Sequence, residues 1–225
     1  SIVLSTTNVT NVNFGVEQLP TANAVIGANK VNPGGAVKVT VPTLNGADPE
    51  QGVFAGSGNA DTIVIRTLPS NAVLYYNNVA VVAGDTIKNY NPSLLTADPN
   101  DGAITVSFTY AEVDAALQSS GDATASMSFT TVLISGNVYD DANALQDETV
   151  SGAGTNAGNT LYAQLLNSGY TVIATTAVAA DGTYNFAGLN GGTYSVLINT
   201  SSSASTSVSL PAGWADRWAR AGRRF

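Results

Sequence analysis

The sequence predicts an all-β protein built from two tandem β-sandwich domains. Short segments in which apolar and polar residues alternate recur along the whole chain, and Asn, Asp, Gly or Pro residues separate them. Charged residues make up only 11% of the chain, and Glu, Lys and Arg, which favour surface helices, are scarce. A length of 225 residues is enough for one large or two ordinary domains.

The first domain is predicted between residues 21 and 130. We expect strands at residues 36–41, 62–67, 72–76, 79–82, 104–110 and 123–129. Asn77-Asn78 lies between two of these strands and is expected to form a two-residue hairpin turn, because Asn tolerates positive φ. The apolar residues from Ile104 to Tyr110 alternate and share one face. Residues 111–117 are compatible with one short helical turn.

The second domain is predicted between residues 131 and 213. Leu161, Ala163 and Leu165 alternate, as expected for a strand with one buried face. Turns are expected at residues 167–169, 181–182 and 191–192, where Asn, Asp and Gly gather. The segment from Gly192 to Leu210 predicts one strong strand and one weak, Ser-rich strand. Residues 1–20 form an N-terminal strand segment and linker, and residues 214–225 form an Arg-rich tail.

The composition excludes several classes of function. The chain has no Cys and no His, which removes Ser-His-Asp and Cys-His catalysis and most zinc sites. A net charge of −8 offers no basic footprint for nucleic acid, and no apolar run is long enough to span a membrane. The paired carboxylates lie in predicted loops without an aromatic-lined cleft. We therefore expect no enzymatic activity.

One loop gathers oxygen-bearing side chains within nine residues. They are Asp140, Asp141, Asn143, Asp147 and Glu148. Ca²⁺ takes about six to eight oxygen ligands from a flexible loop, so this set is a candidate calcium site. Asp and Asn also serve solvated polar turns, and both interpretations stay open. Asp98, Asn100 and Asp101 form a second acidic set, which Asp48 and Glu50 echo. For both, ordinary Asp-Pro turn chemistry is favoured over a metal.

The second domain resembles the B-type, prealbumin-like (transthyretin-like) repeats of bacterial surface adhesins. The matching segments are Gly136–Asp141, Asp147-Glu148, Asp181–Phe186 and Gly192–Tyr194. The resemblance implies a small β-sandwich that binds calcium through the first acidic loop. Ala144 stands where these repeats usually carry a glycine.

The first domain resembles the cadherin-like, immunoglobulin-fold repeats of giant bacterial adhesins. The matching segments are Leu68–Ile87, Leu95–Ala97 and Ile104–Asp114. The combination of the two modules is similar to surface filaments and gliding adhesins of Bacteroidetes-type bacteria. This resemblance implies an extracellular protein of the cell surface.

The N-terminal segment resembles a strand of a B-type module, although it precedes the first domain. Asn8 to Glu17 resembles the last strand of a B-type module, and the link Leu19–Ala22 follows it. Val12, Phe14 and Val16 alternate onto one face, and Val9 precedes them. We expect the C-terminal module to lack such a strand. A sandwich that lacks a strand exposes apolar core and an unpaired edge, which invites another chain.

We therefore expect a structural subunit of an extracellular bacterial filament. Residues 8–17 of one copy would add a strand to the C-terminal domain of its neighbour, with Val9, Val12, Phe14 and Val16 at the polymer interface. Two alternatives stay open. The segment could pair within its own chain, or the sequence could be one repeat of a larger adhesin that binds host or surface glycans or a protein and is stiffened by calcium.

Overall fold

The structure, a computed structural model, describes residues 13–54, 61–141 and 150–215. Strands account for 48% of the residues and helix for 2%, which confirms the predicted all-β class. The regular helix in these ranges is the single-turn 3-10 helix η1 (Pro92–Leu94), which Asn91 caps by accepting a hydrogen bond from the Ser93 N–H. No helix of the described residues is long and apolar enough to cross a membrane.

The chain folds as two compact units, each assembled from separate stretches. Unit 1 contains the described residues of Ser1–Gly27, Val39–Ala97 and Ser107–Met127. Unit 2 contains those of Ala28–Lys38, Asp98–Val106 and Ser128–Phe225. The four-part division predicted from the sequence stays a prediction.

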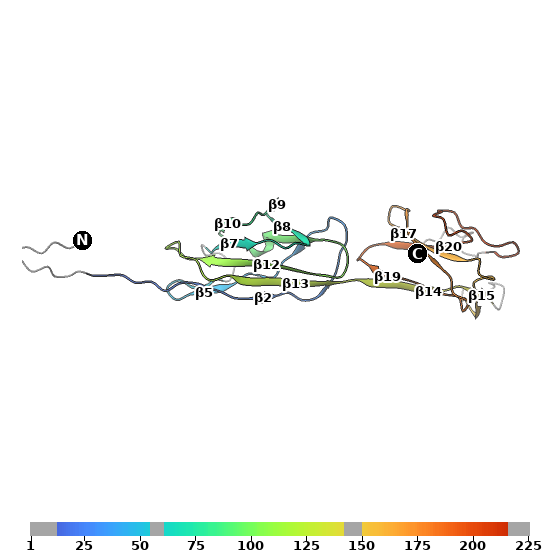
Figure 1. The fold of residues 1–225 in the computed structure, drawn as a ribbon, viewed down its shortest axis with the longest axis horizontal. Coiled ribbons are helices and arrows are strands. Elements are labelled where there is room, and N and C mark those ends of the chain that lie inside the picture. The colour runs from blue at the N-terminus through green and yellow to red at the C-terminus, as the bar shows by residue number, and fades with distance from the viewer. Residues whose placement is uncertain (1–12, 55–60, 142–149, 216–225) are drawn as a thin grey trace, which may run out of the picture. The chain divides into compact units, whose positions relative to one another are not determined.

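Three sheets are built from the strands that precede residue 131, and Figure 1 shows the longest of these strands side by side. The first has the order β1 (Thr21–Ala22), β5 (Gly46–Asp48), β6 (Gly52–Phe54). The second has the order β10 (Thr86–Lys88), β7 (Thr62–Thr67), β12 (Ile104–Val113), β13 (Ala123–Thr130), β2 (Val25–Ile26), with β3 (Lys30–Val31) also paired to β13. The third has the order β4 (Val39–Thr40), β11 (Leu95–Pro99), β8 (Ala72–Tyr76), β9 (Val79–Ala80).

Unit 1 encloses a densely buried core because the apolar faces of its strands meet. Ile63 and Ile65 on β7 are fully buried, as are Phe108 and Tyr110 on β12. The Tyr110 hydroxyl donates to the carbonyl oxygens of Asn23 and Asn45 at 2.6 and 2.7 Å, which satisfies its polar end inside the core. The alternation predicted from Ile104 to Tyr110 therefore identified the inner face correctly.

The strands after residue 131 also form small sheets. These are β14 (Val132–Asn137) with β19 (Thr183–Leu189), β15 (Tyr139–Asp141) with β16 (Gly152–Gly154), and the order β18 (Val172–Ala177), β17 (Tyr162–Asn167), β20 (Tyr194–Asn199). The buried cluster of unit 2 consists of Leu161, Ala163, Leu165, Val178 and Phe186. The alternation of Leu161, Ala163 and Leu165 thus predicted the buried face of β17.

Two local predictions have different outcomes. Asn77 and Asn78 have φ values of 48° and 65° and join β8 to β9, as predicted for a two-residue hairpin turn. The short helical turn at residues 111–117 does not form, because β12 stays paired with β7 as far as Val113. The chain turns only after that, at Asp114.

Candidate assembly interface

The N-terminal segment is the least buried apolar part of the described chain. Residues 13–19 form no strand, and the side chains of Phe14 and Val16 are 86% and 96% exposed. Val9 and Val12, the other two predicted interface residues, lie outside the described residues. Two large apolar side chains therefore stand in water at alternate positions of an unpaired segment.

The same segment is attached to unit 1 immediately after Val16. The Gln18 N–H donates a long hydrogen bond of 3.4 Å to Glu50 Oε1, and Pro20 is buried. Thr21 and Ala22 then pair with Ala47 and Gly46. Gly46 permits this approach, because a Cβ at that position would collide with the Thr21 carbonyl oxygen.

Buried carboxylates gather at the end of unit 1 where the N-terminal segment is attached. Asp48 Oδ1 accepts hydrogen bonds from the N–H groups of Glu50 (2.9 Å) and Gln51 (2.7 Å). Asp114 Oδ1 accepts one from the Gln118 N–H at 2.7 Å. The second oxygens of Asp48 and Asp114, and Oε2 of Glu112, are buried without a hydrogen-bond partner among the described residues.

Two carboxyl groups at this end of unit 1, Glu112 and Glu17, have raised pKa values. Burial, followed by the nearby Asp61, raises the pKa of the Glu112 carboxyl to about 8. Desolvation, followed by Asp114, raises the pKa of Glu17, with smaller contributions from Glu50 and Asp48. We call Glu17, Asp48, Glu50 and Asp114 the acidic cluster. The raised pKa values of Glu112 and Glu17 indicate that the surroundings of these two carboxyl groups disfavour negative charge.

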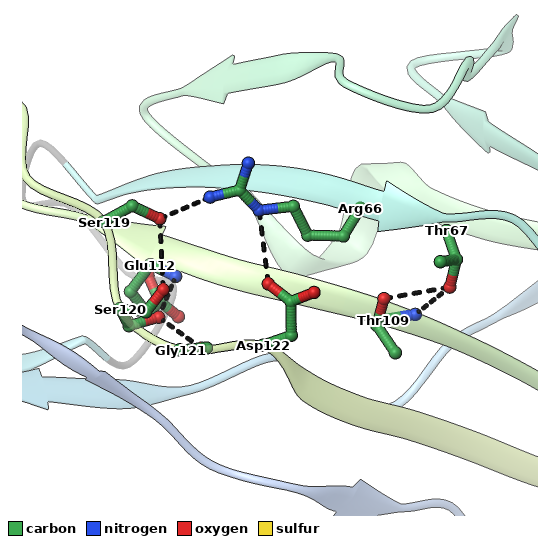
Figure 2. Close-up of polar contacts among 8 residues, drawn as sticks. All are labelled: Arg66, Thr67, Thr109, Glu112, Ser119, Ser120, Gly121 and Asp122. Atoms are coloured by element: carbon green, nitrogen blue, oxygen red, sulfur yellow. Dashed lines mark hydrogen bonds and ion pairs between the residues drawn. The ribbon is translucent and has the colours of Figure 1, made fainter.

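Arg66 lies near this region but contacts a different carboxylate (Figure 2). Its Nε is 3.3 Å from Asp122 Oδ1, and its Nη2 donates to Ser119 Oγ at 2.6 Å. Glu112 is held by its backbone instead: its N–H donates to Ser120 Oγ at 3.0 Å, and the Ser120 N–H donates to its carbonyl oxygen at 2.9 Å. The guanidinium therefore links β7 to the β12–β13 connection through one ion pair and one hydrogen bond.

Unit 2 has an open sheet edge at β20. In the described ranges β20 pairs with β17 along its whole length and with no strand on its other side. Tyr194, Val196 and Ile198 alternate along β20 and pack against the buried cluster of unit 2, yet all three remain partly exposed. The core of unit 2 thus borders an edge strand whose backbone can accept another strand.

The Ser-rich segment after β20, predicted as a weak strand, forms no strand of that sheet. The Gln164 side chain binds it by donating to the carbonyl oxygens of Ser201 (3.1 Å) and Ser203 (2.7 Å) and accepting from the Ser205 N–H (3.1 Å). Gln164 alternates with the core residues Ala163 and Leu165, so its side chain lies on the opposite face of the sheet. The segment therefore covers the outer face at Gln164 and also reaches the end of β20, where the Asn199 side chain donates to the Ser207 carbonyl oxygen at 2.7 Å.

Only part of the predicted calcium loop is described. Asp140 is exposed on β15, and Asp141 Oδ1 accepts a hydrogen bond from the Ser151 N–H at 2.9 Å. Asn143, Asp147 and Glu148 lie outside the described residues. In the ranges that the structure covers, no three His, Cys, Asp or Glu side chains are placed to hold a metal by themselves. Calcium at this loop stays a prediction.

Comparison with known proteins gives little. No protein-family model matches the chain, and no curated protein matches it. Among solved structures, a variant of BcpA, the major pilin subunit of Bacillus cereus, aligns with a TM-score of 0.37 and 9% sequence identity. The alignment covers 80% of this chain and 57% of the pilin chain, so this chain spans little more than half of the pilin's length. That similarity is too low to carry a function.

Proposed function

We propose that the chain is a non-enzymatic structural subunit of an extracellular bacterial surface filament. In this proposal residues 8–17 of one copy pair with the β20 edge of unit 2 in the next copy. The observation that carries the proposal is a complementary pair of features. Phe14 and Val16 are exposed at alternate positions of an unpaired segment, and β20 presents half-exposed core residues beside an open edge.

The energetics favour such a contact. Burying Val12, Phe14 and Val16 would contribute roughly 5–9 kcal/mol before the entropy of ordering the segment is subtracted. Backbone hydrogen bonds to β20 would fix the register, because a slip by one residue turns every apolar side chain away from the core. The donor belongs to one unit and the acceptor to the other, so a contact between copies is heterologous and can repeat without closing.

The direct test removes the donor and then returns it as a peptide. Deletion of residues 1–17 should leave soluble subunits that form no filaments in electron micrographs. A synthetic peptide of residues 1–18 should then bind the deletion variant and raise its melting temperature in proportion to peptide occupancy. Filaments of normal length from the deletion variant would rule out the proposal.

The matched control is the same peptide with F14D and V16D. Charged side chains at these positions cannot enter an apolar core without a large desolvation cost, so this peptide should not bind. Equal binding of both peptides would mean that the apolar face does not direct the contact.

A second function is favoured by the buried oxygens of the acidic cluster. As a module of a larger adhesin, unit 1 would use calcium to hold its N-terminal segment in place. Asp48 and Asp114 each have a buried oxygen without a hydrogen-bond partner among the described residues, although the cluster does not place three carboxylates to hold a metal by themselves. Backbone carbonyl oxygens and water would complete the ligand set that Ca²⁺ requires. Glycan ligands stay a prediction.

The two calcium sites can be separated by substitution. If calcium binds the acidic cluster, EDTA should lower the melting temperature of the wild type, and D48N/D114N should abolish that difference. If it binds the loop, D140N/D141N should abolish the difference instead. An unchanged melting temperature in EDTA would exclude a stabilising calcium at either place.

A further inference from the structure

We infer that the end of unit 1 around Leu117 and Val53 is a second contact surface for the neighbouring copy, seated against that copy's unit 2. The inference rests on the proposed function. It adds a surface that the donor strand does not include. Leu117, on the turn after β12, is 79% exposed, and Val53, on the short strand β6, is 72% exposed. Both lie at the end of unit 1 where the N-terminal segment is attached.

Leu117 is presented on a rigid turn in an unusual backbone conformation. Its φ is +67°, in the left-handed region that branched side chains rarely adopt. The turn is closed at three points: the Leu117 N–H donates to the Asp114 carbonyl oxygen (3.1 Å), the Asp114 N–H to the Gln118 carbonyl oxygen (3.0 Å), and the Gln118 N–H to Asp114 Oδ1 (2.7 Å). These hydrogen bonds hold an exposed apolar side chain in a backbone conformation that costs free energy, a combination that is enriched at functional sites.

The turn lies beside the attachment point of the donor segment. The Ala115 N–H donates to Gln51 Oε1 at 3.2 Å, and Glu50, the preceding residue, accepts from Gln18. Figure 1 shows β12 ending at the same end of unit 1 at which the N-terminal segment enters. Leu117, Val53 and the start of the segment therefore share one end of the unit.

The length of the connecting chain identifies the occupant. Four residue steps separate Val16 from the buried Pro20, and an extended chain spans at most about 3.6 Å per residue, so these two residues can be no more than roughly 14 Å apart. A sheet that accepts residues 8–17 must therefore lie directly against this end of unit 1. The surface that fits is the ring of partly exposed apolar side chains around the buried cluster of unit 2, Val196 and Ile198 among them, in a second copy.

The chain contains no cysteine, so single cysteines report this contact cleanly. L117C should react with a maleimide in the subunit before assembly and be protected in filaments. V82C is the control, because Val82 is also exposed (59%) on unit 1 but lies before β10, away from the turn. V82C should react equally in both states. Equal reactivity of L117C before and after assembly would overturn the inference.

A substitution gives an independent readout. L117N keeps a residue that tolerates positive φ but removes the apolar side chain, so the subunit should keep its melting temperature. The concentration needed for assembly should rise about tenfold, as expected for the loss of an apolar anchor at an interface, whereas V82N should leave it unchanged. Equal effects of L117N and V82N would also overturn the inference.

The outcomes separate this inference from the proposed function. If the deletion of residues 1–17 stops assembly while L117N assembles like the wild type, the donor-strand proposal stands and the Leu117 surface is wrong. If the deletion variant assembles normally, the donor-strand proposal fails, and this inference fails with it.

Discussion

Unit 1 and unit 2 bury their cores to different degrees. In unit 1 the central side chains of β7 and β12, such as Ile65 and Phe108, are almost completely removed from water. In unit 2 the buried cluster of five residues is surrounded by apolar side chains that stay partly exposed, Val196 and Ile198 among them. The two units share a strand-rich composition, so composition does not explain the difference. It lies in how many strands cover each apolar face.

The comparison suggests that the two units would have different roles in a filament. A closed core gives unit 1 the stability to act as a rigid spacer, because apolar area removed from water contributes roughly 25 cal/mol per Å². At the open edge of unit 2, the backbone groups of β20 pair with no further strand among the described residues, and part of the apolar surface stays exposed. Another strand can cover both. In a filament the less complete unit would gain the most from its neighbour.

The largest expected effect comes from removing the same atoms from the two cores. Ile65 is fully buried in unit 1, and Ile198 is partly exposed in unit 2. I65A should lower the free energy of unfolding of unit 1 by about 3–5 kcal/mol, whereas I198A should cost unit 2 only about 1 kcal/mol in the free subunit. Denaturant unfolding of each variant measures both values. If I198A cost as much as I65A, the two cores would be equally closed and the comparison would be wrong.

The next largest effect concerns the buried carboxyl group of Glu112 in unit 1. The pKa of Glu112 is about 8 in the folded chain and 4.5 when exposed. Folding therefore favours the protonated form of Glu112. The free energy of unfolding is highest, with respect to this group, below pH 4.5, and it falls as the pH rises toward 8. E112Q cannot ionise and should make the chain more stable than the wild type at pH 8, by on the order of 4 kcal/mol, but not at pH 4.

Melting temperatures measured from pH 4 to pH 9 in the presence of EDTA check this prediction without interference from cations. D85N is a suitable control, because Asp85 lies on an exposed turn where its side chain caps the Val82 N–H. A pH profile of E112Q that parallels the wild type would show that Glu112 is ionised in the fold.

A smaller effect tests how tightly β14 and β19 pack in unit 2. Gly136 faces Tyr184 across the two strands, and a Cβ at this position would overlap the Tyr184 ring and hydroxyl. G136A should therefore destabilise unit 2 by about 1–3 kcal/mol, as overpacking does. G121A in unit 1 is the control, since a Cβ there meets nothing. If G136A left the stability of unit 2 unchanged, Tyr184 would be free to move aside, and unit 2 would be less tightly packed than the pairing of β14 and β19 implies.

The smallest expected effect concerns the β8–β9 turn of unit 1. Asn78 already adopts φ of 65°, a conformation that glycine reaches without strain. N78G should change the melting temperature by no more than a few degrees in the stabilising direction, because Asn-Gly is the preferred pair in such hairpins. A clear loss of stability would show that the Asn78 side chain makes contacts that matter more than the turn.

Local sequence signals predicted much of the fold. Alternation located β7, β8 and β12 closely, and Asn77-Asn78 identified a hairpin turn, because side-chain period and φ preference act over a few residues. The same reasoning missed the end of β12, since pairing with β7 held residues 111–113 in the strand. It also missed the surroundings of Asp114 and Glu112, which depend on partners far away in the chain.

The sequence alone determined the all-β class, the absence of thiol and imidazole chemistry, and the alternating apolar residues of the N-terminal segment. Only the tertiary structure decided which carboxylates lie buried together, that the Ser-rich segment covers the outer face of its sheet, and that Leu117 stands exposed on a strained turn. The reason is physical. Periodicity and turn chemistry are local, whereas burial, pKa and an open sheet edge arise from segments that meet only when the chain folds.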